Sequence, residues 1–187
     1  MKIFRVAIMS AALGVFVSLS LVRAQEPKSS PSPHDAKASF SVVNFQKLLP
    51  MLPEPPTGWK ADKPEGSTTE SEGFSLTTAG RTYVQGEAEN APTVTLNILD
   101  SGNSKQFYDL TTATWNVSKE TAEGYMKAVT IDGNRGYEQF TKDGEIGNLW
   151  VIVGGRYFVQ VETTHLPPAE MQNWLKKLDL KKLAAVK

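Results

Sequence analysis

The chain has 187 residues, of which 40% are hydrophobic, and its 20 lysine and arginine residues balance 20 aspartate and glutamate residues. This length suffices for one domain with a hydrophobic core, and the absence of a basic excess argues against a nucleic-acid partner. The sequence contains no cysteine, which excludes disulfides, thiol catalysis, zinc sites built on thiolates and the lipid-attachment cysteine of a bacterial lipoprotein.

Residues 1–24 have the pattern of a secretory signal peptide. Lys2 and Arg5 precede an apolar run that reaches Val22, and cleavage is expected after Ala24. The alternative is an uncleaved anchor helix, but the run is shorter than the roughly 20 apolar residues that span a bilayer. No later segment has a membrane-spanning pattern. We therefore expect a soluble exported protein, periplasmic or extracellular, without a lipid anchor.

Residues 25–39, QEPKSSPSPHDAKAS, are rich in proline, serine and charge, and they are predicted to form a disordered tether that includes His34. Residues 40–187 are predicted to form a single domain. At its start, residues 40–52 have an approximate helical stripe of apolar side chains, which predicts a helix. The proline-rich segment that follows predicts irregular structure held to the core by Trp59.

Strand patterns follow in series. Residues 74–84 and 93–100 show partial alternation and many β-branched side chains, so they should form an antiparallel pair. Residues 105–113 are assigned to a helix. Glycine-containing turns then separate four segments that predict a meander of strands, which are residues 124–132, 135–144, 146–153 and 156–164.

The clearest hairpin is NLWVIVGGRYFVQVE, residues 148–162, with Gly154 and Gly155 at its turn. Both of its faces are apolar near the turn, whereas a sheet with one face in water should alternate cleanly, so we expect both faces to be covered. The expected pairs are Ile152 with Tyr157 and Trp150 with Val159 on one face, and Val151 with Phe158 and Leu149 with Gln160 on the other.

Residues 167–187 predict a helix that begins at a proline and places Met171, Trp174, Leu175 and Leu178 on one face. An antiparallel sheet of about six strands, with the early and terminal helices packed on its faces, satisfies these patterns. The predicted fold class is therefore α+β with a three-layer tendency.

The run LPEPPTGWKADKPEGSTTESEGFSLTTAGRTYVQG, the strand ending at Asp100 and the terminal LKKLDLKKLAAV resemble a group of uncharacterised exported bacterial proteins. These motifs contain no catalytic signature, so the resemblance implies no activity. The order of predicted elements is similar to the Mog1/PsbP-type fold, which implies a helix-sandwiched antiparallel sheet and an accessory role in binding partners. No binding residue of that family corresponds to a position in this chain, and fold alone does not determine function.

Catalytic and metal-binding motifs are not found in the sequence. His165 is the only histidine in the predicted domain, no G-x-S-x-G motif occurs, and we expect His165 to cap or hydrogen-bond a turn at a strand end. Two histidines without cysteine do not build a usual zinc site, and Asp100, Asp132 and Asp143 lie near turns that lack the spacing of a calcium loop. No cofactor is predicted, because phosphate-binding loops are also missing.

Two arginine–tyrosine pairs are the candidate ligand-binding residues. In a simple meander, Arg135 and Arg156 begin strands at the same end of the sheet, about 10 Å apart, and Tyr137 and Tyr157 lie beside them. Guanidinium groups suit carboxylate and phosphate ligands, so this end of the sheet is a hypothetical site for an anion. The alternative is that both arginines pair with nearby acidic side chains.

The favoured interpretation is a non-catalytic binding or accessory module of the cell envelope, with an envelope protein or a small anionic ligand as its partner. One alternative is a hydrolase whose carboxylate pair is formed only in three dimensions. Another is a structural or stress-related envelope protein. Two close, buried carboxylates in a cleft would favour the hydrolase, and a polar surface without them would favour the binding module.

Overall fold

The computed structural model describes residues 41–71 and 74–187. The predicted signal peptide, residues 1–24, and the predicted tether, residues 25–39 with His34, lie outside the described residues. The described chain is α+β, as predicted, and its strands form one antiparallel sheet. Nine strands make up this sheet, so the expected number of about six was too low. Among the described helices, none has both the length and the apolar character needed to cross a membrane.

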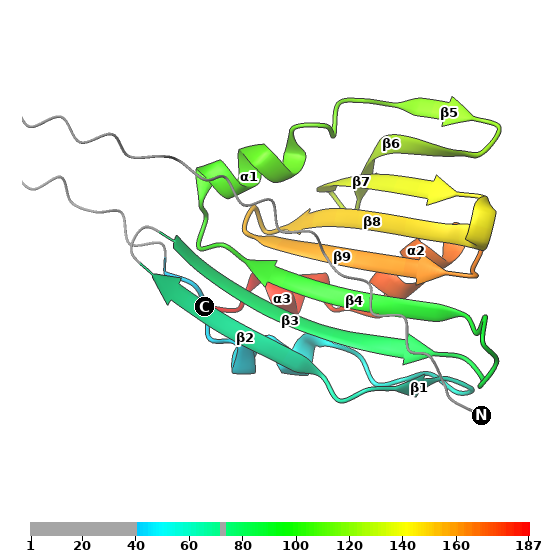
Figure 1. Ribbon diagram of the computed structural model, residues 1–187. Helices are drawn as coiled ribbons and strands as arrows, with labels where there is room; N and C mark the ends of the chain where they lie inside the picture. The colour runs from blue at the N-terminus through cyan, green and yellow to red at the C-terminus, as the bar shows by residue number, and fades with distance from the viewer. Residues whose placement is uncertain (1–40, 72–73) are drawn as a thin grey trace, which may run out of the picture. The chain divides into compact units, whose positions relative to one another are not determined.

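The strands are β1 (Lys60–Ala61), β2 (Glu65–Ser71), β3 (Phe74–Val84), β4 (Thr93–Asp100), β5 (Lys119–Thr121), β6 (Gly124–Ile131), β7 (Asn134–Thr141), β8 (Ile146–Val153) and β9 (Tyr157–Thr164). Their order across the sheet is β1-β3-β4-β9-β8-β7-β6-β5, and β2 pairs with β3 on the same side as β1. Figure 1 shows β4 and β9 side by side in the middle of the sheet.

The predicted β3–β4 pair and the predicted meander of β6 to β9 are both confirmed. The strands missing from the prediction are β1, β2 and β5, which are short or polar. The sequence of β2, EGSTTES, contains no large apolar side chain, and hydroxyl pairs help to hold it to β3. Ser67 contacts Thr78 at 3.1 Å, and Thr68 contacts Thr77 at 2.9 Å, in both cases between side-chain oxygens.

The β8–β9 hairpin differs in register from its prediction. The observed pairs are Val153 with Tyr157, Ile152 with Phe158, Val151 with Val159 and Trp150 with Gln160. Its loop therefore has three residues, in which Gly154 and Gly155 have φ angles of 60° and 68° that favour glycine. Arg156 is the third loop residue and leaves the ladder, because its side chain binds Asp100. A shift of one residue changes every cross-strand partner.

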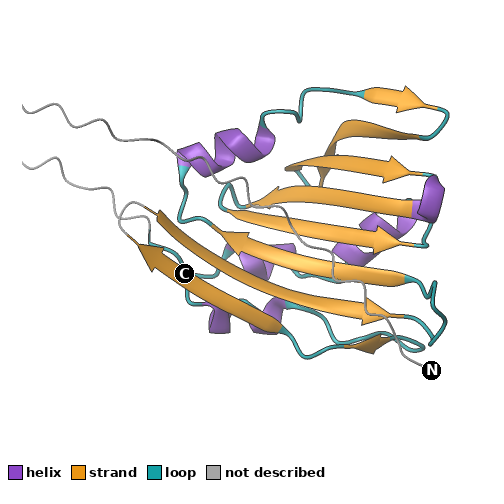
Figure 2. Ribbon diagram, in the orientation of Figure 1, coloured by secondary structure: helices purple, strands orange, loops and turns teal. Residues whose placement is uncertain are grey.

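One face of the sheet carries the main hydrophobic core, beneath short helices. These are η1 (Phe45–Lys47), η2 (Leu49–Met51), α2 (Ala169–Leu175) and α3 (Leu180–Ala184), while η3 (Asp143–Glu145) connects β7 to β8. Figure 2 shows the helices of this layer behind the strands. Trp174 on α2 is buried, with ring centroids 4.8 Å from Trp59 and 4.7 Å from Tyr83. Trp59 therefore holds its irregular segment to the core, as predicted.

The helix predicted for residues 40–52 is wrong within the described part of that segment, which contains two short 3₁₀ turns instead. The backbone N–H groups of this segment bind the sheet, because Val43 N donates to Asp100 Oδ2 and Phe45 N donates to Thr68 Oγ1. The proline of η2 also lacks an N–H group that could extend a helix.

The predicted C-terminal helix is divided into α2 and α3. The Asp179 side chain accepts a hydrogen bond from Lys182 N at 2.9 Å and so begins a second helix. The predicted apolar face is nevertheless buried in full, and it consists of Met171, Trp174, Leu175 and Leu178.

The opposite face, called the α1 face below, is covered at one end only. Helix α1 (Lys105–Thr112) lies within the predicted helix 105–113, and its Phe107 ring packs 5.2 Å from the Phe158 ring. Trp115 stacks on Tyr137 with an angle of 9° between the rings. The β8–β9 hairpin is therefore covered on both faces near its turn, as predicted. Towards β2 and β3, the α1 face carries polar side chains instead.

Candidate functional site

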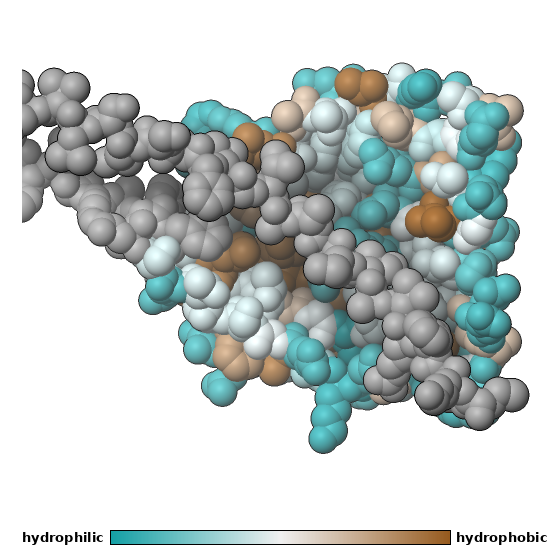
Figure 3. Space-filling model, viewed as in Figure 1, coloured by the Kyte–Doolittle hydropathy of each residue, from teal (hydrophilic) through white to brown (hydrophobic). Residues whose placement is uncertain are grey.

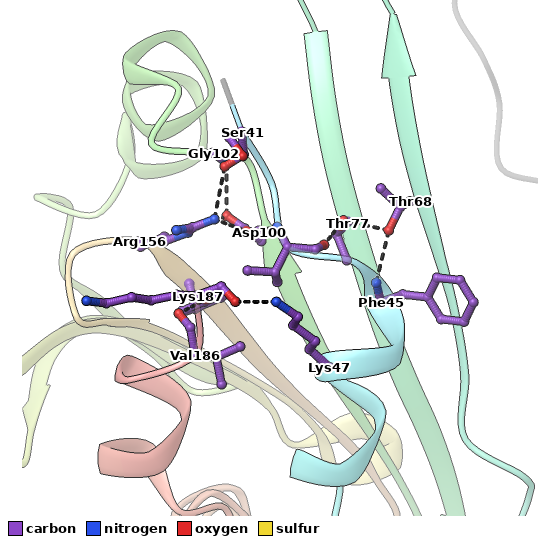
Figure 4. A network of polar contacts seen from close by, with 12 residues as sticks. Ser41, Phe45, Lys47, Thr68, Thr77, Asp100, Gly102, Arg156, Val186 and Lys187 are labelled. Atoms are coloured by element: carbon purple, nitrogen blue, oxygen red, sulfur yellow. Dashed lines mark hydrogen bonds and ion pairs between the residues drawn. The ribbon is translucent and has the colours of Figure 1, made fainter. Parts of the chain in front are cut away.

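Arg156 forms a bidentate ion pair with Asp100 at the end of β4 (Figure 4). Its Nε donates to Oδ1 at 2.9 Å, and its Nη2 donates to Oδ2 at 2.7 Å and to Ser41 O at 3.0 Å. The buried carboxylate also accepts the backbone N–H groups of Val43 and Gly102, at 2.8 and 2.9 Å. The hydrogen bonds to Asp100 and its charge raise the pKa of Arg156. This guanidinium is therefore bound within the protein.

Arg135 lies on the α1 face, where it contacts uncharged groups. Its Nη1 donates to Tyr108 Oη at 3.2 Å, and its Nη2 donates to Asn116 Oδ1 at 3.4 Å. Its guanidinium carbon lies 5.5 Å from the ring centroid of Trp115. No carboxylate of the described ranges forms an ion pair with Arg135.

The two candidate tyrosines are buried on opposite faces of the sheet. Tyr137 donates its hydroxyl to Val117 O beneath the α1 side, and Tyr157 donates to Val186 O on the helix-covered core side, both at 2.8 Å. Both arginines do lie at the same end of the sheet, with Arg135 near the start of β7 and Arg156 directly before β9, and β8 separates these two strands. Because the four side chains are divided between two faces, they do not line one common site.

Two described acidic residues are fully buried, and they do not form a pair. Asp100 binds Arg156, as described above. Glu138 on β7 accepts Tyr125 Oη at 2.5 Å and Gln172 Nε2 at 3.0 Å. Burial, followed by the hydrogen bond to Glu138, raises the pKa of Tyr125. In the sheet register, the two carboxylates are separated by three strand-to-strand spacings, from β4 to β7, and by four residues along a strand. Together these correspond to about 20 Å.

His165 follows β9 with a φ of 57°, and its backbone N–H donates to Gly144 O at 3.1 Å. This backbone contact joins the loop after β9 to the loop between β7 and β8. The imidazole was expected to hydrogen-bond a turn, but its buried Nδ1 atom has no hydrogen-bond partner among the described residues. Asp132 and Asp143 lie in turns as expected. Across residues 41–71 and 74–187, no group of three histidine, aspartate or glutamate side chains is arranged to hold a metal ion.

A groove of about 750 Å³ lies on the α1 face over β2, β3 and β4, and we call it the polar groove. Its half-buried side chains are Thr78, Thr82, Thr95 and Asn97, and its exposed ones are Asp62, Lys63, Glu65 and Ser67. Ligand sites typically have volumes of about 300–1,000 Å³, but they are mostly apolar, whereas this lining is rich in hydroxyl groups. Figure 3 shows this side of the molecule, and the part that the grey residues leave visible carries teal and white residues as well as brown ones.

Beside the groove, polar side chains on β4, β9 and β8 form what we call the amide network. Asn97 Nδ2 donates to Gln160 Oε1 at 3.4 Å, and Gln160 Nε2 donates to Asn148 Oδ1 at 3.2 Å and to Glu162 Oε1 at 2.5 Å. Gln160 is only 9% exposed, while the other three side chains are half-buried. The register also places half-buried Trp150 in one row with Asn97 and Gln160. The amides are therefore held in fixed positions before any ligand arrives.

Gly80 provides space in the floor of the groove. It lies opposite Asn97 in the β3–β4 ladder, and a Cβ atom at this position would approach Asn97 Oδ1 to 2.5 Å. A side chain at Gly80 would therefore displace the amide or fill the groove. The absence of a side chain allows the Asn97 carboxamide to lie over β3.

The groove and the network contain more acidic than basic groups. Asp62 and Glu65 lie at the groove and Glu162 lies in the network, against the single ammonium group of Lys63. The backbone of Arg81 also lines the groove, but its guanidinium donates to Pro53 O at 3.0 Å and pairs with Glu54 at 3.1 Å. The hydrogen bond to Glu54 raises the pKa of Arg81. This surface therefore favours neutral or cationic ligands over anions.

Sequence reasoning concentrated on arginine and tyrosine and missed this surface. A signal was available, because Thr93, Thr95 and Asn97 alternate with buried Val94, Leu96 and Ile98 along β4. Gln160 and Glu162 alternate in the same way with Val159 and Val161 on β9. Such alternation identifies a polar face, but only the strand order shows that these residues lie side by side.

Comparison with models of protein families, with curated proteins and with solved structures gives no match.

Proposed function

We propose that this chain is a non-catalytic binding module whose ligand occupies the polar groove. The observation that supports this proposal is the amide network beside the groove. Its polar groups are oriented by one another, and Asn97, Asn148 and Glu162 remain partly exposed to solvent around the buried Gln160. Fixed side chains lose little conformational freedom when a ligand binds, so they favour recognition.

The alternative hydrolase requires an acid pair that the buried carboxylates do not supply. Retaining enzymes separate the two carboxyl groups by about 5 Å and inverting enzymes by about 6.5–9.5 Å. Asp100 and Glu138 are about 20 Å apart by the sheet register. Each is also held by donors within the protein, namely Arg156 for Asp100 and Tyr125 with Gln172 for Glu138. These contacts favour structural roles for both acids.

We also propose that the module acts after export, in the periplasm or outside the cell, as an accessory protein of the envelope. The signal-like pattern of residues 1–24 supports export, and N-terminal sequencing of the secreted chain should begin at Gln25. An intact Met1 on the exported chain would contradict cleavage. The helix-covered antiparallel sheet is compatible with a Mog1/PsbP-type fold, which we retain as a proposal.

Hydrogen exchange of the full chain, with and without a cell-envelope extract from its host, tests the binding site. We expect the extract to protect amides of β3 and β4 at the groove. Gly80→Ala should reduce this protection by displacing Asn97, and Thr82→Arg should reduce it by filling the groove. Thr130→Val changes an exposed threonine of β6 outside the groove and is the matched control.

Protection of β3 and β4 that survives in the control and falls in both folded groove variants supports the proposal. Two groove variants are used because either one could be destabilised, and circular dichroism identifies the folded ones. Protection at another surface, or no protection in the wild type, overturns the proposal and favours the structural or stress-related role.

A further inference from the structure

The polar groove has the side-chain chemistry of a site for sugar hydroxyl groups. A hydroxyl group both donates and accepts hydrogen bonds, and a carboxamide presents a donor and an acceptor side by side. Thr82, Thr95 and Asn97 bring both kinds of group to the floor of the groove. The Thr82 and Thr95 hydroxyl groups pair with each other at 3.2 Å, and Asn97 Nδ2 donates to Gln160. An apolar ligand would leave the remaining donors and acceptors of these half-buried groups unsatisfied, which costs binding free energy.

The charges of this surface argue against an anionic ligand. Glu162 contributes an ionised acceptor to the network, and Glu65 lies at the opposite side of the groove. Lys63 is the one basic side chain whose charged group is left available there, since Arg81 is bound to Glu54. A carboxylate can accept hydrogen bonds from two neighbouring sugar hydroxyls without a charge on the ligand.

An aromatic side chain completes the site beyond the network. Trp150 lies in the row Asn97–Gln160–Trp150, two strands from Asn97, which corresponds to about 10 Å. It is half-buried, so part of its indole is accessible on this face. The apolar face of an indole can cover the C–H face of a sugar ring. Because the indole is large and rigid, it provides this contact area with little loss of side-chain conformational entropy.

We infer that the polar groove and the amide network bind a neutral oligosaccharide, with its hydroxyl groups on Asn97 and Glu162, which the buried Gln160 holds in place, and with one sugar ring near Trp150. This inference rests on the proposed function and names its ligand class. The network holds its own donors and acceptors in place, so binding exchanges water for sugar hydroxyls without rearranging the sheet.

An array of neutral linear oligosaccharides, probed with the full chain, tests the ligand class. Chitohexaose and cellohexaose are then titrated in solution by calorimetry, with oligogalacturonate as the anionic probe and tetralysine as the cationic probe. We expect at least one neutral oligosaccharide to bind more tightly than either charged probe, because the acidic groups repel oligogalacturonate and tetralysine lacks hydroxyl groups that both donate and accept hydrogen bonds. Asn97→Ala should weaken the affinity about tenfold, because it removes a hydrogen-bonding partner of the ligand. Gln160→Ala should weaken it by a similar factor, because it releases the side chains of Asn97 and Glu162.

Trp150→Ala should weaken binding more than Trp150→Phe, since phenylalanine retains an aromatic face. The matched control is Thr130→Val, and Arg135→Ala is a second control that changes a cationic side chain of the same face; neither should alter the affinity. Preferential binding of oligogalacturonate or tetralysine would overturn the inference. An array on which the full chain binds no neutral oligosaccharide would also overturn the inference.

The two proposals fail in distinguishable ways. If no neutral oligosaccharide is retained but the envelope extract still protects β3 and β4, the saccharide inference is overturned and the binding function stands. If the extract also fails to protect the groove, both are overturned.

Discussion

The guanidinium of Arg156 holds the buried carboxylate of Asp100 through two hydrogen bonds, although the residues are 56 positions apart in the chain. This contact joins the β8–β9 loop to the end of β4. The same carboxylate binds Val43 N, which fixes the start of the described chain against the sheet. Arg156 was expected to bind a ligand. Its pair with Asp100 instead joins three segments of the fold, which are the β8–β9 loop, the end of β4 and the start of the described chain.

Replacing Arg156 with methionine should lower the free energy of unfolding by about 3 kcal/mol, because the carboxylate of Asp100 would stay buried without a counter-charge. Arg135→Met is the matched control at the same end of the sheet, and its exposed contacts should contribute less than about 1 kcal/mol. Urea unfolding at neutral pH measures both. If both variants lose the same free energy of unfolding, the Arg156–Asp100 pair does not contribute more than the exposed contacts of Arg135.

Stability should fall at alkaline pH because of the buried tyrosines. Burial raises the pKa of Tyr83 from 10.0 to about 12, and it also raises the pKa of Tyr125 and of Tyr157. The unfolded chain loses these protons near pH 10, while the folded chain retains them. The stabilisation is therefore complete below the unfolded pKa, and it is lost as the pH rises through the folded pKa.

Tyr83→Phe isolates one contribution to this pH dependence. Between about pH 10 and 12, the wild type should lose stability relative to the variant by up to about 1.4 kcal/mol per pH unit. Urea unfolding at several pH values checks this, since lysine titration affects both proteins alike. Parallel curves for the two proteins would contradict the raised pKa of Tyr83.

Tyr125→Phe should lower the free energy of unfolding by about 2 kcal/mol. The variant removes the hydroxyl that donates to Glu138 and leaves that buried carboxylate with Gln172 and a longer contact to Lys127 of 3.5 Å. Lys127→Met is the comparison, because its ammonium is half exposed and should contribute less than about 1 kcal/mol. If Lys127→Met loses more free energy of unfolding than Tyr125→Phe, the contact from Lys127 to Glu138 is the stronger of the two, which contradicts this prediction.

Gly147→Ala should be destabilising by about 2 kcal/mol through steric overlap between β8 and α2. A Cβ atom at this position would collide with Thr163 Oγ1 and would lie 2.7 Å from Met171 Sδ. Thermal unfolding measures the effect. The double variant Gly147→Ala/Thr163→Ala removes one of the clashing atoms, so it should be more stable than Gly147→Ala alone. If Gly147→Ala matches the wild type, β8 and α2 are not in close contact here.

Most strong strands were predictable, since local alternation and turn residues define them. The β3–β4 pair and the meander of β6 to β9 belong to this class. The 3₁₀ turns found in place of the predicted N-terminal helix were not predictable, because N–H groups of this segment bind Asp100 and Thr68, which lie far away in the chain. Local helical periodicity does not report hydrogen bonds to residues distant in the chain, and here these bonds replace those of a helix.

The candidate site was less accessible to sequence reasoning than the fold. Arg135 and Arg156 were correctly expected at one end of the sheet, but a side chain in a loop has no strand parity that assigns it to a face. Arg156 leaves the ladder, and its contact with Asp100 directs it to the core side. The amide network forms because β4 and β9 are neighbours in the sheet. These strands are far apart in the chain, so local sequence patterns do not show that they pair.

The β4–β9 ladder also has a consequence for the folding pathway. It connects the β3–β4 hairpin to the β6–β9 meander, and its paired residues run from Thr93 with Thr164 to Asp100 with Tyr157. The β2–β3, β3–β4, β5–β6, β6–β7, β7–β8 and β8–β9 ladders join strands that are consecutive in the chain, so these hairpins can form early at a small loop-closure cost. We expect the two preformed halves to meet late through β4 and β9, in a slow step that assembles the polar surface and the core together.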